Sequence, residues 1–177
     1  MIEEEPKDMT RLVWTSLIVC VVGLLSTALI PVALAERAMA ASGTLCWMAP
    51  SDSFDVTKAA DGNVFISATE VDQYTGTFRG TGNGVFTLVV HPEGFATGRG
   101  QEFVTGTVMG KSGTWEIRWT GNTRNDLGNW WFEWIIVGGT GDLANLRGQG
   151  GGSGPGPAGL DQWGCADYSA VVTFAPG

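Results

Sequence analysis

The sequence is poor in histidine and cysteine, two side chains that many catalytic and metal sites use. It has one histidine and three cysteines among 177 residues, and only 16% of its residues are charged. The single histidine, His91, precedes Pro92 at the expected end of a strand, which disfavours a catalytic triad built on histidine. The spacings C-x-x-C and H-E-x-x-H and the acidic calcium loop are absent, so we predict no metal site and no cofactor.

Positive charge is scarce as well. The chain has 10 lysines and arginines against 18 aspartates and glutamates, a formal net charge of -8. Such a surface repels the phosphate backbone of DNA or RNA. We therefore predict no nucleic-acid partner.

Glycine and tryptophan, by contrast, are abundant, at 27 and 8 residues. Candidate strands recur about every ten residues with Gly, Asn or Pro between them, which is typical of an antiparallel barrel or sandwich. We expect one all-β domain over residues 41–177. Its expected strands are Thr44–Met48, Val64–Thr69, Gly76–Arg79, Val85–His91, Phe95–Gly98, Glu102–Val108, Thr114–Thr120, Trp130–Val137 and Tyr168–Phe174.

A long hydrophobic run precedes this domain. Residues 12–35 carry no charge and exceed the roughly 20 residues that cross a bilayer as a helix. Small residues in the A-x-A order of a signal-peptidase site end at Ala35 and again at Ala40. An uncleaved anchor is the alternative, because the run is longer than a usual signal core and its N-terminal flank is acidic. We predict that residues 1–40 are a signal peptide or membrane anchor and that the rest is secreted or extracytoplasmic.

Two cysteines lie near the two ends of the expected domain. In an oxidising compartment, an even pair such as Cys46 and Cys165 favours one disulfide between them. The alternative is two unpaired, buried thiols.

The two aromatic strands differ in their alternation. In residues 114–120, apolar side chains point to one face while Glu116 and Arg118 point to the other. In residues 130–137 both faces are apolar, and one carboxylate, Glu133, is embedded among tryptophans. A buried carboxylate needs a partner, and Arg118 is the candidate. The alternative is a solvated outer face.

The stretch 148–164 reads G-Q-G-G-G-S-G-P-G-P-A-G-L-D-Q-W-G. Glycine supplies backbone freedom and proline prevents strand pairing, so we expect a long flexible loop. The order of a phosphate-binding loop is absent from it.

Two further segments carry a family resemblance. Residues 98–115 read G-R-G-Q-E-F-V-T-G-T-V-M-G-K-S-G-T-W, and residues 139–151 read G-T-G-D-L-A-N-L-R-G-Q-G-G. Over about Val64 to Gly152, the chain resembles a bacterial family of uncharacterised domains in the allene oxide cyclase-like barrel superfamily. In the second segment, glycines allow sharp strand bends, and Leu143 and Leu146 are expected to plug the core.

The resemblance implies an antiparallel β-barrel of about eight strands, preceded here by an N-terminal hydrophobic helix, with room inside for side chains or one small ligand. Relatives by fold include fatty-acid epoxide cyclases, dirigent proteins and polyketide cyclases, which hold an apolar substrate in a chosen shape. We accordingly expect an exported barrel that binds a small apolar molecule and, if it is an enzyme, cyclises or isomerises it without a cofactor. The alternative is a noncatalytic module that binds a protein or glycan at the cell surface.

Glu102 lies in the first segment and is the candidate catalytic residue, as a polariser or proton relay. Tryptophans of the aromatic strands and their charged neighbours are the ligand-binding candidates. These candidates are Trp115, Trp119, Trp130, Trp134, Glu133 and Arg118. For the tryptophans, a filled core is an equally good interpretation.

Overall fold

The structure, a computed structural model, describes residues 37–123 and 128–175. The predicted export segment and its helix, over residues 12–35, lie outside these ranges. Within them, the chain is mostly strand with one 3-10 turn, η1 (Ser51–Ser53), and no helix is long and apolar enough to cross a membrane. The strands are β1 (Met39–Met48), β2 (Asp55–Lys58), β3 (Val64–Gly76), β4 (Phe78–Val90), β5 (Ala96–Val108), β6 (Lys111–Thr123), β7 (Asn129–Gly141), β8 (Leu146–Pro155) and β9 (Gly164–Phe174).

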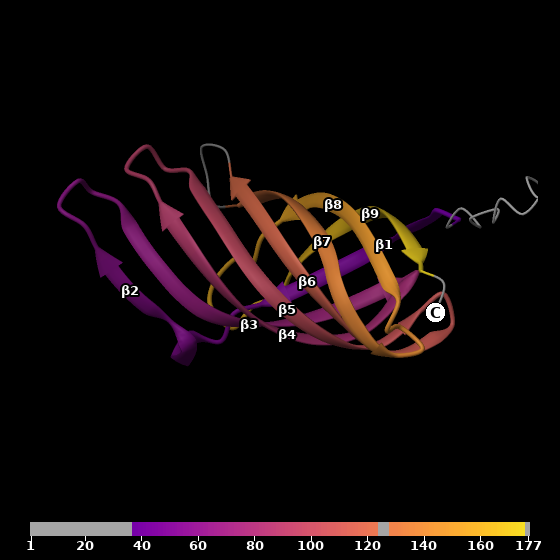
Figure 1. The fold of residues 1–177 in the computed structure, drawn as a ribbon. Coiled ribbons are helices and arrows are strands. Elements are labelled where there is room, and N and C mark those ends of the chain that lie inside the picture. The colour runs from indigo at the N-terminus through magenta and orange to yellow at the C-terminus, as the bar shows by residue number, and fades with distance from the viewer. Residues whose placement is uncertain (1–36, 124–127, 176–177) are drawn as a thin grey trace, which may run out of the picture. The chain divides into compact units, whose positions relative to one another are not determined.

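The strands form an antiparallel sheet that closes on itself (Figure 1). Pairing of β1 with both β9 and β3 completes a barrel of eight strands, as predicted. The short strand β2 is an addition that pairs with the first residues of β3, whereas β1 pairs with its last residues. Thus β1 and β2 follow one another along the same edge of β3.

The barrel has two ends that differ in their connections. At the first, which we call the packed end, tight turns at residues 77, 109–110 and 142–145 join neighbouring strands. At the second, the open end, lie η1, β2 and the longer connections 91–95 and 156–163. In Figure 1 the open end is on the left, and the packed end is beside the C-terminal label.

Several strands are longer than the sequence predicted. The expected strands Gly76–Arg79 and Val85–His91 are one strand, β4, apart from their outermost residues. In the same way, Phe95–Gly98 and Glu102–Val108 join into β5. The glycines between these pairs suggested breaks, but ladders on both sides supply the hydrogen bonds that hold them extended.

The expected loop over residues 148–164 is wrong in its first half. Leu146–Pro155 forms β8, which pairs with β7 on one side and β9 on the other. Its glycines face large rings: a Cβ at Gly150 would lie 2.7 Å from the ring of Trp134, and one at Gly152 would lie 2.8 Å from Phe132. Because glycine has no side chain, β8 leaves room for these aromatic rings.

The packed end holds a dense core of large side chains. Phe78 and Trp115 are each 1% exposed, and their ring centroids are 5.7 Å apart. Leu143 and Leu146, from the glycine-leucine segment, have no exposed surface, as their predicted role as plugs requires. These contacts make this end a filled core rather than a binding site.

A disulfide joins Cys46 in β1 to Cys165 in β9, as predicted. The two residues lie directly opposite each other in the antiparallel ladder. The bond therefore fastens one of the ladders by which β1 closes the barrel, near the open end.

Candidate functional site

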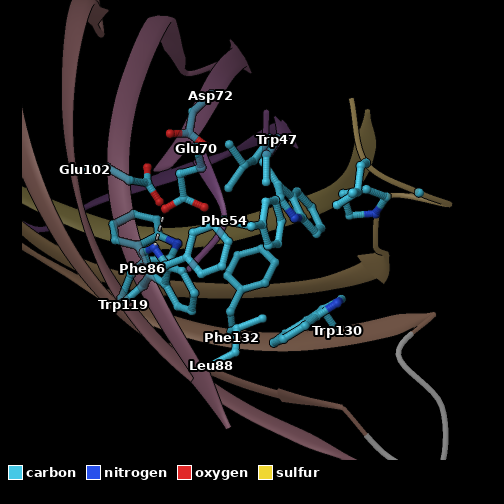
Figure 2. A pocket seen from close by; sticks show the side chains of 16 residues that line it. Trp47, Phe54, Glu70, Asp72, Phe86, Leu88, Glu102, Trp119, Trp130 and Phe132 are labelled. Atoms are coloured by element: carbon cyan, nitrogen blue, oxygen red, sulfur yellow. Dashed lines mark hydrogen bonds between the residues drawn. The ribbon is translucent and has the colours of Figure 1, made fainter. Parts of the chain in front are cut away.

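The open end contains an apolar cavity of about 320 Å³ (Figure 2). This volume lies within the range of small-molecule sites in proteins. Its walls are mostly aromatic and aliphatic, and the connection between β8 and β9 contributes to its lining. The lining residues are Leu45, Trp47, Ala49, Phe54, Glu70, Asp72, Phe86, Leu88, Glu102, Trp119, Trp130, Phe132, Trp134, Pro157, Gly159 and Leu160.

The connection between β8 and β9 is held against the end of β1. The backbone N–H of Ser51 donates a 2.9 Å hydrogen bond to the carboxylate of Asp161, and the N–H of Asp161 donates to the carbonyl of Ala49. Leu160, beside this anchor, lines the cavity and is 55% exposed. The connection therefore places an apolar side chain at the border between cavity and solvent.

Three carboxyl groups lie on the inner side of the cavity, nearest the packed end. Glu70 and Asp72 come from β3 and Glu102 comes from β5, and an oxygen from each lies within 4.8 Å of the others. All three are buried, with exposed fractions of 5%, 0% and 3%. We call these three residues the carboxyl cluster; Figure 2 shows them gathered on one side of the cavity.

A glycine on the intervening strand allows the cluster to form. In the ladder, Gly84 of β4 lies between Glu70 and Glu102. A Cβ at this position would lie 2.7 Å from a carboxylate oxygen of Glu70, closer than such contacts allow. Without a side chain at Gly84, the carboxyl groups approach each other across β4.

Two hydrogen bonds orient two of the three carboxyl groups. The Tyr74 hydroxyl donates to Oε2 of Glu102 at 2.5 Å, and the indole Nε1 of Trp119 donates to Oε1 of Glu70 at 3.0 Å. Neither side-chain oxygen of Asp72 has a hydrogen-bond partner among the described residues. Asp72 therefore has unused hydrogen-bonding capacity, and it lies at the wall of the cavity.

Burial sets the protonation of the cluster. Desolvation, reinforced by the negative charges of Glu102 and Glu70, raises the pKa of Asp72 to about 10. Desolvation raises the pKa of Glu102 to about 7, and the bond from Tyr74 opposes that rise. The pKa of Glu70 is raised well above its usual value by burial and by Glu102. At neutral pH, Asp72 is thus a neutral acid while Glu102 is close to its titration midpoint.

The predicted site residues divide into two groups. Glu102, Trp119, Trp130 and Trp134 line the cavity, as a ligand-binding role requires. Trp115 does not line it, because it points into the packed end and is 1% exposed.

Glu133 is not embedded among tryptophans, because its side chain and that of Arg118 are exposed on the outer face, where both line a surface hollow rather than the cavity. Arg118 lies 3.5 Å from Glu116 in an ion pair, and Glu133 is opposite Thr120 in the ladder. The outer-face alternative holds.

The sequence reasoning missed Glu70 and Asp72. The strand expected from Val64 ended at Thr69, whereas β3 continues to Gly76. Alternation along the full strand puts Glu70, Asp72 and Tyr74 on one face, opposite Val71. This alternation could have identified the two acids from the sequence. It was missed because the usual pattern is the reverse, with apolar residues facing in and acids facing out.

The carboxyl cluster is also the group of described residues that could hold a metal ion. The expectation that no metal site exists rested on local spacing in the sequence. Residues from two strands separated by a third cannot produce such a spacing, so that expectation did not address this cluster.

The fold and the site together define a class: a small antiparallel barrel with an apolar cavity at one end and buried carboxyl groups beside it. Residues 48–154 match the family described as "Protein of unknown function (DUF3224)", and the chain belongs to this family. The resemblance inferred from the sequence is therefore confirmed. No curated protein matches the sequence.

One solved structure of the family shares this fold. A DUF3224-family protein of unknown function from Shewanella oneidensis MR-1 is similar with a TM-score of 0.63 and 16% identity, over 80% of this chain and 100% of that chain. The pterocarpan synthase dirigent proteins GePTS1 and PsPTS1 give TM-scores of 0.48 and 0.49 and identities of 14% and 15%. They match over 79% and 80% of this chain and 92% and 98% of their own chains.

Proposed function

We propose that this protein is an extracytoplasmic barrel that binds a small apolar molecule at its open end and moves a proton on it, as a cofactor-independent isomerase or cyclase. The observation that carries the proposal is a cluster of three buried carboxyl groups, Glu70, Asp72 and Glu102, in an otherwise apolar cavity. A filled core would have no use for such a cluster, since burying carboxyl groups is costly.

The cavity's size and walls support the binding of a small apolar molecule. Its volume of about 320 Å³ compares with about 150 Å³ for an engineered apolar cavity that takes up benzene. A body of about two rings therefore fits. The tryptophan and phenylalanine rings offer it a large apolar contact area.

The cluster supports proton transfer because its members differ in pKa. Glu102, with a pKa of about 7 and with its carboxylate oriented by Tyr74, is suited to accept a proton from carbon. Asp72, with a pKa of about 10, remains neutral and can donate a hydrogen bond to an oxygen that gains negative charge. Return of the proton from Glu102 to a different carbon completes an isomerisation without an oxidant or a reductant.

The disulfide between Cys46 and Cys165 supports the extracytoplasmic location. Disulfides of this structural kind persist mainly in oxidising compartments.

The test is native mass spectrometry of the protein purified from its own host. We expect a reproducible bound small molecule that is lost in Trp130→Ala, which removes a wall of the cavity. Trp131→Ala is the matched control, because Trp131 is the next residue but lies on the outer face and is 41% exposed. After incubation with the protein in deuterium oxide, the recovered molecule should carry deuterium on carbon, and Glu102→Gln should abolish this incorporation.

Two results would count against the proposal. A protein that is always empty, or that loses its ligand equally in the two tryptophan variants, contradicts binding in the cavity. A bound molecule that gains no deuterium with the wild-type protein removes the enzymatic part and leaves a binding protein.

A further inference from the structure

The cavity has an excess of acidic groups and no base to balance them. Glu70, Asp72 and Glu102 line it, whereas none of the lysines, arginines or the histidine in the described ranges does. A ligand carboxylate or phosphate would find no cation to pair with in this low-dielectric site, and its charge would oppose ionisation of the three acids. The cavity therefore discriminates against anionic ligands.

Asp72 shows that the cluster has capacity for a ligand. Its side chain has no exposed surface, and both of its oxygens lack a hydrogen-bond partner among the described residues. Buried polar groups in folded proteins are normally hydrogen-bonded, so an orphaned carboxyl that lines a cavity indicates a missing partner. The partner must donate hydrogen bonds if Asp72 is ionised.

The aromatic walls of the cavity favour a cationic ligand. Tryptophan and phenylalanine rings attract cations through their faces, and tryptophan does so most strongly. Four tryptophans line the cavity together with Phe54, Phe86 and Phe132. An aromatic enclosure with carboxylates on one side is a recurrent way to recognise an organic ammonium ion.

We infer that the natural ligand is an organic cation, a primary ammonium group attached to an apolar body of about two rings, with the ammonium held by Glu70, Asp72 and Glu102. This inference rests on the proposed binding of an apolar molecule and specifies its ligand. With an ammonium bound, Asp72 is ionised and accepts a hydrogen bond, in place of the neutral donor role given to it above. A primary ammonium has three N–H donors, and the cluster offers three carboxyl groups whose oxygens lie within 4.8 Å of one another. The apolar body then occupies the aromatic part of the cavity.

A metal ion fits the same cluster less well. Calcium takes six to eight oxygen ligands, and magnesium keeps several bound waters. Beyond the cluster, the described residues that line the cavity are aromatic or aliphatic, with Pro157, Gly159 and Leu160 from the β8–β9 connection, and none of them has a carboxylate or amide side chain. A metal would therefore need water molecules in a space bounded mainly by apolar groups.

The test compares three probes of the same shape: naphthylethylamine, naphthylethanol and naphthylacetate, which are cationic, neutral and anionic at pH 7.5. Isothermal titration of the protein purified from its host, after removal of any bound molecule, gives their affinities. We expect the amine to bind about ten- to a hundredfold more tightly than the alcohol, as a hydrogen-bonded charge pair provides. We expect naphthylacetate to bind most weakly.

Variants locate the effect in the cluster. Asp72→Asn keeps the shape of the side chain but cannot ionise to pair with a bound ammonium, and should reduce the preference for amine over alcohol. Glu70→Gln, if Asp72→Asn fails to fold, makes the same test. Glu133→Gln is the matched control, because it removes one carboxylate from the exposed outer face and should keep the preference.

The outcomes separate the two proposals. Equal affinities for the amine and the alcohol overturn the inference and leave the proposed binding of an apolar molecule intact. Failure of all three probes to bind overturns both proposals. Calcium or magnesium chloride is titrated in the same way. If the metal ion displaces the amine and its binding is lost in Asp72→Asn, the ligand of the cluster is a metal ion and not an organic cation.

Discussion

The packed end and the open end are built from the same strands yet differ in how their inward side chains meet. In β4, Phe78 is 1% exposed and touches the rings around it, whereas Phe86, eight residues along the same inward face, lines the cavity. Leu143 and Leu146 plug the packed end, while at the open end residues of the connection 156–163 line the cavity without filling it. One end therefore stabilises the barrel, and the other offers space for a ligand.

The carboxyl cluster lies between these two regions. Tyr74, which packs against Phe78 and Trp115, donates its hydrogen bond to Glu102. Trp119, which lines the cavity, donates to Glu70. The dense core thus holds one carboxyl group of the cluster in place, and a wall of the cavity holds another.

Matched phenylalanine substitutions should give the largest difference in stability between the two ends. Phe78→Ala should lower the free energy of unfolding by about 3–5 kcal/mol, because a fully packed ring leaves a void. Phe86→Ala should cost about 1–2 kcal/mol, because its ring already faces open space and loses fewer contacts. Urea denaturation followed by circular dichroism measures both.

The reverse order is expected for ligand affinity, which only Phe86→Ala should weaken. Equal destabilisation by the two substitutions would mean that the open end is packed as densely as the other and that the distinction is wrong.

A second, smaller effect is expected at the glycine that allows the cluster to form. Gly84→Ala places a methyl group 2.7 Å from the Glu70 carboxylate and 2.9 Å from the carbonyl of Gln101. Overpacking of this kind costs about 1–3 kcal/mol, and displacement of Glu70 should also break its bond from Trp119. Gly138→Ala is the control, because a Cβ there meets nothing within 4 Å.

Thermal unfolding and tryptophan fluorescence measure the two glycine variants together. If Gly84→Ala unfolds at the same temperature as Gly138→Ala and keeps its fluorescence spectrum, the close approach across β4 does not matter for the cluster.

The effect expected to be smallest for each unit of change is a dependence of stability on pH. A carboxyl whose pKa is higher in the folded than in the unfolded state favours the fold at low pH, and this contribution is lost as pH rises towards the folded pKa. For Glu102 the loss runs from about 4.5 to about 7, and for Asp72 from 3.8 to about 10. Unfolding free energy should therefore fall between pH 5 and 9, with Asp72 contributing on the order of 1 kcal/mol per pH unit.

Asp72→Asn should flatten this slope, since asparagine does not titrate. Glu133→Gln also removes one carboxyl group, but from the exposed outer face, and should leave the slope as it is. Parallel pH profiles for the wild type and Asp72→Asn would show that Asp72 is not a neutral, buried acid.

The sequence by itself determined the barrel, its approximate number of strands, the disulfide and the family. These features depend on alternation of side chains, on glycine between strands, and on motifs such as the one containing Leu143 and Leu146, all of which are local. It also selected Glu102, Trp119, Trp130 and Trp134, all of which line the cavity. It could not separate Trp115 from them, because inward alternation is the same at both ends of a strand.

Only the tertiary structure decided where the strands end, what the glycine-rich segment becomes and which acids meet. The segment 148–155 looked like a linker because its composition disfavours a lone strand, but ladders to β7 and β9 hold it, and the rings of Phe132 and Trp134 fill the space that its glycines leave. Glu70 and Asp72 join Glu102 because Gly84 lies between their strands. Such contacts depend on the register between strands, which brings together residues that are distant in the sequence.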